Sequence, residues 1–317
     1  MAGGKIAIIG GGVMGLTTAH VLLNAGYQID LFTHRPVAET TSSKAAAIWL
    51  PYMANPVAEV NRWSQHSFHV FRALADDAQT GISMVDIDVL VPEEKVWWLG
   101  AIPGGGISTI DPTTLPPEFP LGYQLHVPLI ETQLYLPYLQ QAVLDAGARI
   151  TFQEIANLDS LADRYHFVIN CTGLGARTLV NDDSVYPVKG QLLKVDSQPG
   201  ITPLVADFAF DEAGQDLAYI IPRQDYLVLG GTAIKNDFSE APDPSLTEAI
   251  FARCQQIIQG RLQPGTNVQL MAGLRPARPS IRLEATGNII HNYGHGGAGF
   301  TVSWGCAEEV LALIKRA

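Results

Sequence analysis

The feature that most limits the fold is a glycine motif that directly follows a short apolar run. Residues 6–9 read Ile-Ala-Ile-Ile, the composition of a buried strand. Gly10, Gly12 and Gly15 then fit the spacing Gly-x-Gly-x-x-Gly. In a strand-to-helix turn these glycines make the turn tight, let backbone approach a pyrophosphate and let helix and strand pack closely. The motif therefore favours a dinucleotide site, and a merely glycine-rich turn is the alternative.

The residues after the motif supply the context that it needs. A helix is predicted over residues 16–25, with Gly26 as its stop signal, and a second strand over residues 29–32. Strand, turn, helix and strand make a β-α-β unit. The free N–H groups and the positive dipole end at the helix N-terminus would face the phosphates of the ligand.

The end of the second strand departs from the usual pattern, in which Asp or Glu binds the adenosine ribose. Here the residues are Thr33, His34 and Arg35. His34 could hydrogen-bond a ribose, and Arg35 raises the option of a 2′-phosphate, as in NADP. An equally weighted interpretation is that His34 and Arg35 are solvated loop residues without a ligand.

Composition excludes several classes of protein. The 317 residues leave room for two domains, and 47% hydrophobic against 16% charged residues describe a globular chain with a large core. The formal net charge of −11 disfavours nucleic acid and anionic membranes as partners. No apolar run reaches the roughly 18 residues of a membrane span, and no secretory signal is evident. Three scattered cysteines make neither a disulfide framework nor a zinc site, so we expect a cytoplasmic protein without a metal.

The rest of the chain alternates between helical and β-rich stretches. Between residues 83 and 128, β-like runs at 85–91 and 96–99, broken at 103–106, suggest a separate β-rich layer. Further helices are predicted over residues 56–76, 131–146, 245–259 and 300–314, and further strands over residues 149–155, 167–171, 190–195, 218–221, 226–231, 269–275 and 288–291.

Two later segments have the residue types of a binding site. Short side chains over residues 40–47 would let backbone lie against a flat ligand, although a helix N-cap with an alanine-rich first turn fits equally. Arg275 stands directly before Pro276, and its planar guanidinium suits a carboxylate. The glycine loop at residues 294–299 runs into the last helix, whose N-terminus would stabilise negative charge on a reduced flavin.

Together these segments resemble the D-amino acid oxidases, FAD-dependent members of the larger glycine and sarcosine oxidase superfamily. The matching blocks stand in family order and span nearly the whole chain; they are residues 10–15, 40–52, 170–173, 218–223, 273–276 and 291–305. The resemblance implies an α/β fold in which a Rossmann-like FAD-binding domain is interleaved with a β-rich (α+β) substrate-binding domain. The FAD-binding domain would comprise residues 1–52, 131–185 and 270–317, and the substrate-binding domain residues 53–130 and 186–269.

The resemblance also implies the roles of individual residues. Arg275 and Tyr219 would hold the substrate carboxylate, and the Gly297 carbonyl would accept a hydrogen bond from the substrate amine. The FAD-binding set would consist of Gly10, Gly12, Val13, Met14, Gly15, His34, Arg35, Thr40, Thr41, Ser42, Ala47, Ile48, Gly173, Gly296, Gly297, Gly299, Phe300 and Thr301.

The implied activity is oxidative deamination of neutral D-amino acids to 2-oxo acids, with hydride transfer from the substrate Cα to flavin N5 and release of ammonia and hydrogen peroxide. The small-molecule partners of the protein would be the D-amino acid and O2. A homodimer is one option for its oligomeric state. Two departures bear on specificity. Gln215 replaces a lid tyrosine of many eukaryotic members, and Ala233 stands where aspartate-specific relatives have an arginine. Lys235 and Arg223 are cations, so acidic D-amino acids remain an alternative substrate class.

Other functions remain alternatives. A glycine or sarcosine oxidase shares the flavin chemistry, and a D-aspartate oxidase shares the superfamily. An NAD(P)-dependent dehydrogenase would share the opening motif but would not need the second glycine loop and helix. A flavin-binding protein without catalysis is the remaining class.

Overall fold

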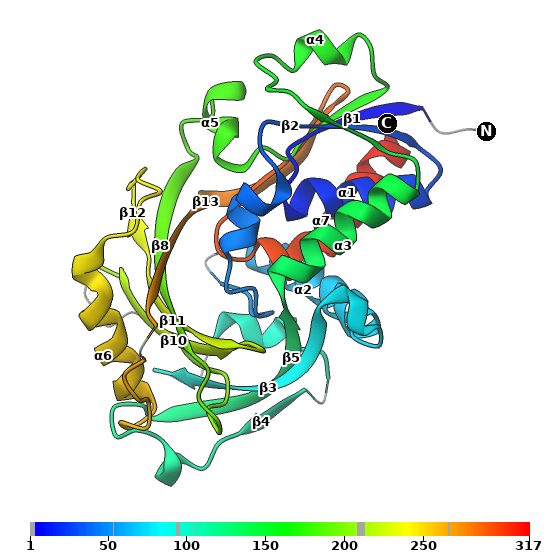
Figure 1. Ribbon diagram of the computed structural model, residues 1–317. Helices are drawn as coiled ribbons and strands as arrows, with labels where there is room; N and C mark the ends of the chain where they lie inside the picture. The colour runs from blue at the N-terminus through cyan, green and yellow to red at the C-terminus, as the bar shows by residue number, and fades with distance from the viewer. Residues whose placement is uncertain (1–3, 53, 93–95, 105, 208–212, 266) are drawn as a thin grey trace. The chain divides into compact units, whose positions relative to one another are not determined.

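The chain forms two compact units, each assembled from segments that lie far apart in sequence (Figure 1). The computed structural model describes residues 4–52, 54–92, 96–104, 106–207, 213–265 and 267–317. The first unit takes the described residues of 1–83, 130–186 and 275–317, and the second those of 84–129 and 187–274. Two residues used in the predictions lie outside the described residues. Met53 is the first residue of the predicted substrate-binding domain, and Gly105 is part of the predicted break at residues 103–106.

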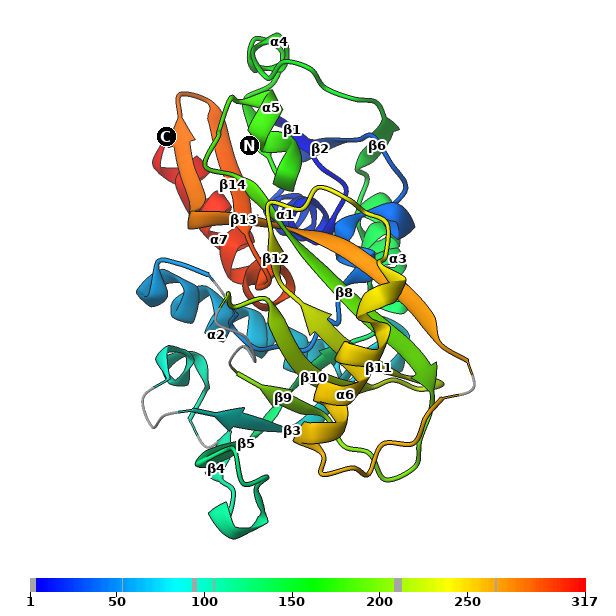
Figure 2. The same ribbon diagram turned by 90° about the vertical axis from the view of Figure 1, so that its left-hand side faces the viewer.

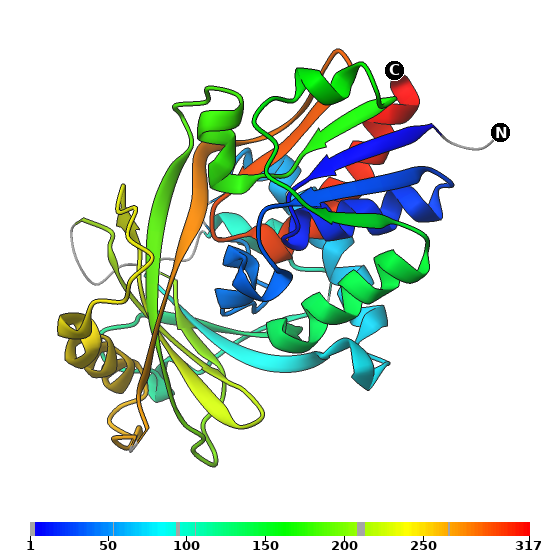
Figure 3. The same cartoon turned by 45° about the horizontal axis from the view of Figure 1, so that its top comes forward.

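The first unit is built on a parallel sheet. Its strands run in the order β14 (Ile289–His295), β7 (Phe167–Asn170), β1 (Lys5–Ile9), β2 (Gln28–Thr33) and β6 (Arg149–Phe152), and all four pairings are parallel. Figure 3 shows these strands side by side. Ile6 to Ile9 are all buried, because a parallel sheet is covered on both faces and needs continuous apolar strands.

Two helices, α1 (Val13–Asn24) and α7 (Gly299–Arg316), pack on this sheet. Two more, α2 (Val57–Leu74) and α3 (Thr132–Asp145), pack on those helices. Helix α1 packs against α3 and α7, and α7 packs against α2 (Figure 1). On the other face, Leu158, Leu161 and Tyr165 around the short α4 (Asp159–Ala162) pack on β1, β2 and β7. A second short helix, α5 (Ala176–Leu179), follows β7.

The second unit is a mostly antiparallel sheet. Its order is β4 (Ile107–Thr109), β5 (Leu121–Ile130), β3 (Ile82–Val91), β9 (Leu204–Ala206), β10 (Asp216–Pro222), β11 (Tyr226–Thr232) and β8 (Tyr186–Asp196), with β12 (Ile234–Lys235) beside β8. Helix α6 (Thr247–Ile257) packs on β10 and β11, as Figure 2 shows.

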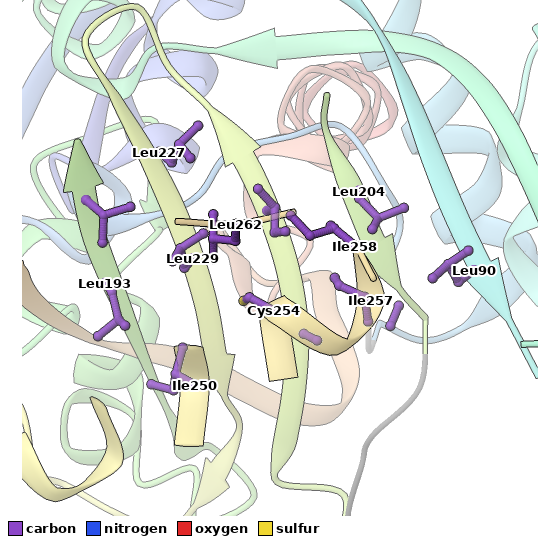
Figure 4. Packing of buried hydrophobic residues seen from close by; sticks show 14 of the residues in the cluster. Leu90, Leu193, Leu204, Leu227, Leu229, Ile250, Cys254, Ile257, Ile258 and Leu262 are labelled. Atoms are coloured by element: carbon purple, nitrogen blue, oxygen red, sulfur yellow. The ribbon is translucent and has the colours of Figure 1, made fainter. Parts of the chain in front are cut away.

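The core of the second unit lies between α6 and one face of this sheet. Ile250, Cys254 and Ile257 of the helix meet apolar side chains of the strands (Figure 4). The strand residues of this cluster are Leu90, Leu193, Val195, Leu204, Ala206, Ala218, Ile220, Leu227 and Leu229. Their spacing of two along each strand leaves the alternate residues on the opposite face of the sheet.

Several predicted elements differ from the observed ones. Residues 97–101 form a 3₁₀ turn instead of a strand. The strand expected over 269–275 extends to Thr286 as β13 (Gln269–Thr286) in spite of Pro276 and Pro279. Strands β3 and β5 are not a separate layer, because β3 pairs with β9 in the same sheet. Residues 53–83, placed by sequence with the substrate-binding domain, belong to the first unit in the described part of the structure.

In the described part of the chain, no helix is both long and apolar enough to span a membrane.

Candidate cofactor and substrate site

The glycine turn after β1 leaves no room for side chains. A Cβ atom built on Gly10 would lie 2.3 Å from the Cys171 carbonyl oxygen, and the φ of Gly10 is +117°. A Cβ atom on Gly15 would lie 1.8 Å from the Gly10 carbonyl oxygen. Glycine at these two positions therefore lets β1, the turn and α1 pack closely, as in the dinucleotide-binding motif.

The N-terminus of α1 follows this turn. The Val13 N–H group donates to the Ser42 hydroxyl at 3.0 Å, and a Cβ atom on Gly12 would come equally close to that hydroxyl oxygen. Val13 and Met14 are buried. The first turn of α1, all of which is described, contains no acidic residue, so no carboxylate of the helix competes for the positive dipole end.

The N-terminus of α7 lies beside that of α1. A Cβ atom on Gly299 would be 4.0 Å from Val13 Cγ1. Phe300 is buried, and the buried Thr301 hydroxyl donates to the Leu50 carbonyl oxygen at 3.1 Å. The first turn of α7, also fully described, has no acidic residue either. Two positive helix ends therefore converge where the sequence predicts an anionic dinucleotide.

A buried hydrogen-bond chain joins the two glycine loops. His295 Nε2 donates to Asn292 Oδ1 at 3.0 Å, Asn292 Nδ2 donates to the Thr18 hydroxyl at 3.3 Å, and that hydroxyl donates to the Met14 carbonyl at 2.7 Å. Burial lowers the pKa of His295 to about 3, so the imidazole is neutral. Sequence reasoning assigned no role to His295 or Asn292, although both stand inside the block that resembles the family.

The remaining predicted FAD residues lie at the ends of β2 and in the loop after it. Arg35 Nε donates to His34 Nε2 at 2.8 Å, and His34 is exposed. The buried Thr40 hydroxyl donates to the Val37 carbonyl at 2.7 Å, whereas Thr41 is exposed. Residues 41–44 form a 3₁₀ turn, not the start of a long helix. Ala47 has a φ of +47° and is buried, and Ile48 beside it is half-buried.

The strand carrying Arg275 is tied to the second glycine loop. The Gly296 N–H group donates to the Pro276 carbonyl at 2.9 Å. Ala277 pairs with His295 in the antiparallel register of β13 and β14, and β14 ends at His295, before the turn that contains Gly297. Gly297 is exposed. Arg275 and Gly297, two of the three residues predicted to bind substrate, are thus the chain neighbours of two residues that share a hydrogen bond.

Two glycines of this part of the first unit lie close to ring side chains. A Cβ atom on Gly297 would lie 2.5 Å from the Tyr52 ring, so the loop sits directly on that side chain. Gly173, with a φ of +57°, lies against Pro276 in the same way, at 3.5 Å. Tyr52 was part of the matching blocks but received no role from sequence.

Tyr219, the third predicted substrate residue, belongs to the second unit. Its ring lies over β11, because a Cβ atom on Gly230 would be 1.9 Å from its Cζ and one on Gly231 would be 2.9 Å from its hydroxyl oxygen. Ala233 is fully buried and its N–H group donates to the Gln215 carbonyl at 2.7 Å. Lys235 is exposed and Arg223 is buried.

Comparison with known proteins decides the family. A model of the family described as FAD dependent oxidoreductase matches residues 5–313. The chain belongs to this family of FAD-dependent oxidoreductases. It is 39% identical to a D-amino-acid oxidase of Rubrobacter xylanophilus, covering 99% of this chain and 96% of that protein. It is 38% identical to the enzyme of the same name from Streptomyces coelicolor, covering 98% and 97%.

Solved structures show the same fold at low identity. Glycine oxidase from Geobacillus kaustophilus superposes with a TM-score of 0.78 and 19% identity, covering 100% of this chain and 95% of that one. L-proline dehydrogenase from P. horikoshii gives a TM-score of 0.80 with 15% identity, covering 99% and 94%. The predicted α/β class is confirmed.

FAD is the cofactor of this family, and the residues of the first unit fit it. The close packing of α1 on the turn after β1, which Gly10 and Gly15 permit, is that of a dinucleotide-binding motif, and the paired N-termini of α1 and α7 supply positive potential for a diphosphate. The family match decides against a nicotinamide nucleotide in this role. Among the described residues, no cluster of three or more His, Cys, Asp or Glu could hold a metal ion.

Proposed function

We propose that the protein oxidises neutral D-amino acids to 2-oxo acids, releasing ammonia and, with O2 as electron acceptor, hydrogen peroxide. Near-full-length similarity to proteins named D-amino-acid oxidase supports this substrate class. The structural support is the hydrogen bond from the Gly296 N–H group to the Pro276 carbonyl, because Gly297 and Arg275 are the chain neighbours of these two residues. A carboxylate and an amine on the same carbon need a cation and an acceptor at adjacent positions, and this pair supplies both.

In this proposal the chain acts by positioning its substrate. Arg275 binds the carboxylate through two parallel charge-assisted hydrogen bonds, and the Tyr219 hydroxyl donates to the same group. The Gly297 carbonyl accepts from the amine and holds it. Bound FAD supplies the two-electron acceptor. No protein nucleophile is required.

The residues predicted to bind FAD have corresponding proposed roles. The amides at the N-terminus of α1 bind the diphosphate, with Ser42 holding Val13 at 3.0 Å. His34 and Arg35, joined by a 2.8 Å hydrogen bond, face the adenosine ribose. The start of α7, from Gly299 to Thr301, faces the flavin. Cytoplasmic location and a homodimer stay predictions of the sequence.

Paired enantiomers test the reaction directly. Purified protein is given D- and L-alanine, D- and L-methionine, both aspartate enantiomers, glycine and sarcosine, and peroxide and 2-oxo acid are measured. We expect activity on the neutral D-enantiomers. Turnover confined to L-enantiomers, or to glycine and sarcosine, contradicts the proposal.

Replacement of the carboxylate-binding arginine tests the site. Arg275→Ala should lower kcat/KM for D-alanine at least about thirtyfold, because a charge-assisted hydrogen bond is worth about 2 kcal/mol or more. Arg72→Ala, which removes an exposed arginine of α2, should change it less than twofold. Flavin content per chain is measured in both variants. Normal turnover in Arg275→Ala with full flavin content would rule out the assigned role.

A further inference from the structure

The pairing of strands β10 and β11 contains a β-bulge. The register shifts between Asp216 and Tyr219, so residues 217–218 of β10 stand opposite Gly231 alone. A bulge increases the local twist of its strand and re-aims the side chains next to it. Tyr219, the proposed carboxylate ligand, is the first residue after this bulge. The shape of the bulge therefore determines where the Tyr219 hydroxyl lies.

One arginine of α6 binds backbone on both strands of the bulge. Arg253 Nε donates to the Leu217 carbonyl at 3.1 Å, and Arg253 Nη2 donates to the Gly231 carbonyl at 3.2 Å. Leu217 and Gly231 are buried. A bulge disrupts the ladder locally, and a buried carbonyl there needs a donor from elsewhere. The guanidinium presents its N–H groups in a rigid planar fork, so this single side chain fixes the spacing of the two strands.

The third nitrogen of the same guanidinium has an acidic partner. Arg253 Nη1 lies 3.2 Å from an Asp216 carboxylate oxygen, and the Arg253 side chain is only 11% exposed. A charge so nearly buried is tolerated when it is paired and hydrogen-bonded. Because Nε, Nη1 and Nη2 each bind a different residue of the β10–β11 pair, the guanidinium has one fixed orientation at the bulge.

The contacts of α6 reach the residue whose hydroxyl would bind substrate. A Cβ atom built on Gly231 would lie 2.9 Å from the Tyr219 hydroxyl oxygen, so Gly231 adjoins both that hydroxyl and Arg253. Cys254, the next residue of α6, has its Sγ 3.5 Å from the Tyr219 carbonyl and 3.5 Å from the Gly230 carbonyl. Helix α6 therefore contacts the backbone of Tyr219 and the backbone beneath its ring.

We propose that Arg253 is a positioning residue, which fixes the bulge and thereby places the Tyr219 hydroxyl where it binds the substrate carboxylate. This inference rests on the proposed function, in which that hydroxyl donates to the carboxylate. Ala218 and Ile220 are packed under α6 (Figure 4), so Tyr219 between them points to the other face of the sheet. Arg253 therefore acts through Tyr219 and not by contact with substrate.

A double-mutant cycle with Tyr219 tests this role. Arg253→Met removes the guanidinium donors and keeps a long side chain. We expect kcat/KM for D-alanine to fall between about threefold and thirtyfold, a part of what a hydrogen bond to a charged group contributes. In the Tyr219→Phe background the same substitution should cost less than about twofold, because the hydroxyl that Arg253 positions is already gone.

Binding of propionate gives a second measurement, without turnover. Propionate has the carboxylate and carbon chain of alanine but no amine, and titration calorimetry of the FAD-loaded protein gives its dissociation constant. This constant should rise about threefold or more in Arg253→Met and stay within about twofold when Arg253→Met is added to Tyr219→Phe. A purely structural role would lower the amount of folded protein in both backgrounds and leave the constant unchanged. Equal losses in both backgrounds, or an unchanged dissociation constant, overturn the inference.

Two further variants make the test specific. Arg261→Met is the matched control, because Arg261 is an exposed arginine just after α6 that donates to the Ile258 carbonyl at 3.1 Å; it should leave both measurements within about twofold. Arg253→Lys covers the case in which Arg253→Met does not fold. Lysine keeps a positive charge for Asp216 but has no planar fork for two carbonyls, so the same pattern of losses is expected. Unchanged values in Arg253→Lys overturn the inference, because the fork is its basis.

Turnover by the unmodified protein separates this inference from the proposed function. If the unmodified protein oxidises no D-amino acid, the proposed function is wrong, and propionate binding still shows whether Arg253 acts through Tyr219. If it oxidises D-alanine and Arg253→Met costs the same factor with and without the Tyr219 hydroxyl, the proposed function stands and only the role of Arg253 is wrong.

Discussion

At the scale of single residues, the turn after β1 depends on glycines, which have no Cβ atom. Gly10 and Gly15 let β1, the turn and α1 pack together, because a methyl group at either position would overlap a carbonyl oxygen, at 2.3 Å and 1.8 Å. Real Cβ atoms do not approach oxygen so closely, so the turn must open if a side chain is added. The glycine spacing in the sequence therefore follows from the close packing of backbone at this turn.

Gly15→Ala should abolish FAD retention, because the turn that faces the diphosphate cannot keep its shape. The ratio of flavin absorbance to protein absorbance after gel filtration measures this. Gly104→Ala is the control, since a Cβ atom there has no neighbour within 4 Å and the φ is not in the left-handed region. Full flavin content in Gly15→Ala would show that the turn does not approach the cofactor.

At the scale of elements, one carboxylate connects the hairpin of β13 and β14 to the loop before β8. Asp182 accepts from Arg278 Nε at 3.0 Å and from the Tyr293 hydroxyl at 2.8 Å, and also from Ser184. Burial alone would raise the pKa of Asp182, but these hydrogen bonds outweigh burial and lower it to about 2. The network holds the strand pair whose other end carries Arg275 and the second glycine loop.

Asp182→Asn should lower the free energy of unfolding by about 2 kcal/mol at pH 7, because the pKa of Asp182 is about 2 in the folded chain and close to its ordinary value in the unfolded chain. The folded pKa lies below the unfolded value, so this contribution is present above about pH 4 and is lost as the pH falls towards 2. Urea unfolding followed by circular dichroism at pH 7 and at pH 3 measures the difference.

The neighbouring residue supplies the control for this prediction. Asp183 is exposed and pairs with Arg177 at 3.1 Å, and surface pairs contribute little. Asp183→Asn should therefore leave stability within experimental error at both pH values. If Asp182→Asn and Asp183→Asn have equal effects, the buried network does not stabilise the hairpin.

At the scale of the whole molecule, the chain passes repeatedly between two units. Each unit collects segments separated by 40 residues or more, such as 1–83 and 130–186 in the first. FAD bound, as proposed, by loops from three separate segments would stabilise their assembly, because it binds the folded state and not the unfolded chain.

The melting temperature should therefore rise with FAD concentration. At free FAD one hundredfold above its dissociation constant, the gain is about 2.7 kcal/mol. Differential scanning calorimetry of flavin-stripped protein, with FAD added in steps, measures it. NADP⁺ at the same concentrations should give no shift, since the family uses FAD; a shift with NADP⁺ alone would contradict the cofactor assignment.

Local patterns in the sequence determined the elements whose signals are short-range. The β-α-β opening and the helices at 132–145 and 299–316 were predicted to within a few residues. Their apolar period and their glycine stops are set by neighbours in the chain. The glycine motif also predicted the class of cofactor, because the close approach of backbone to phosphate requires glycine at fixed spacing.

Only the tertiary structure decided which distant residues meet. Arg278 and Asp182 are 96 positions apart, and Trp98 and Asp207 are 109 apart, so no local period connects them. β13 passes Pro279 at an irregularity in its pairing with β14, which resumes at Arg282, and the strand's own sequence does not show this partner. The sequence by itself determined the cofactor turn and the family resemblance, whereas the buried charges and their partners follow from packing between segments remote in the chain.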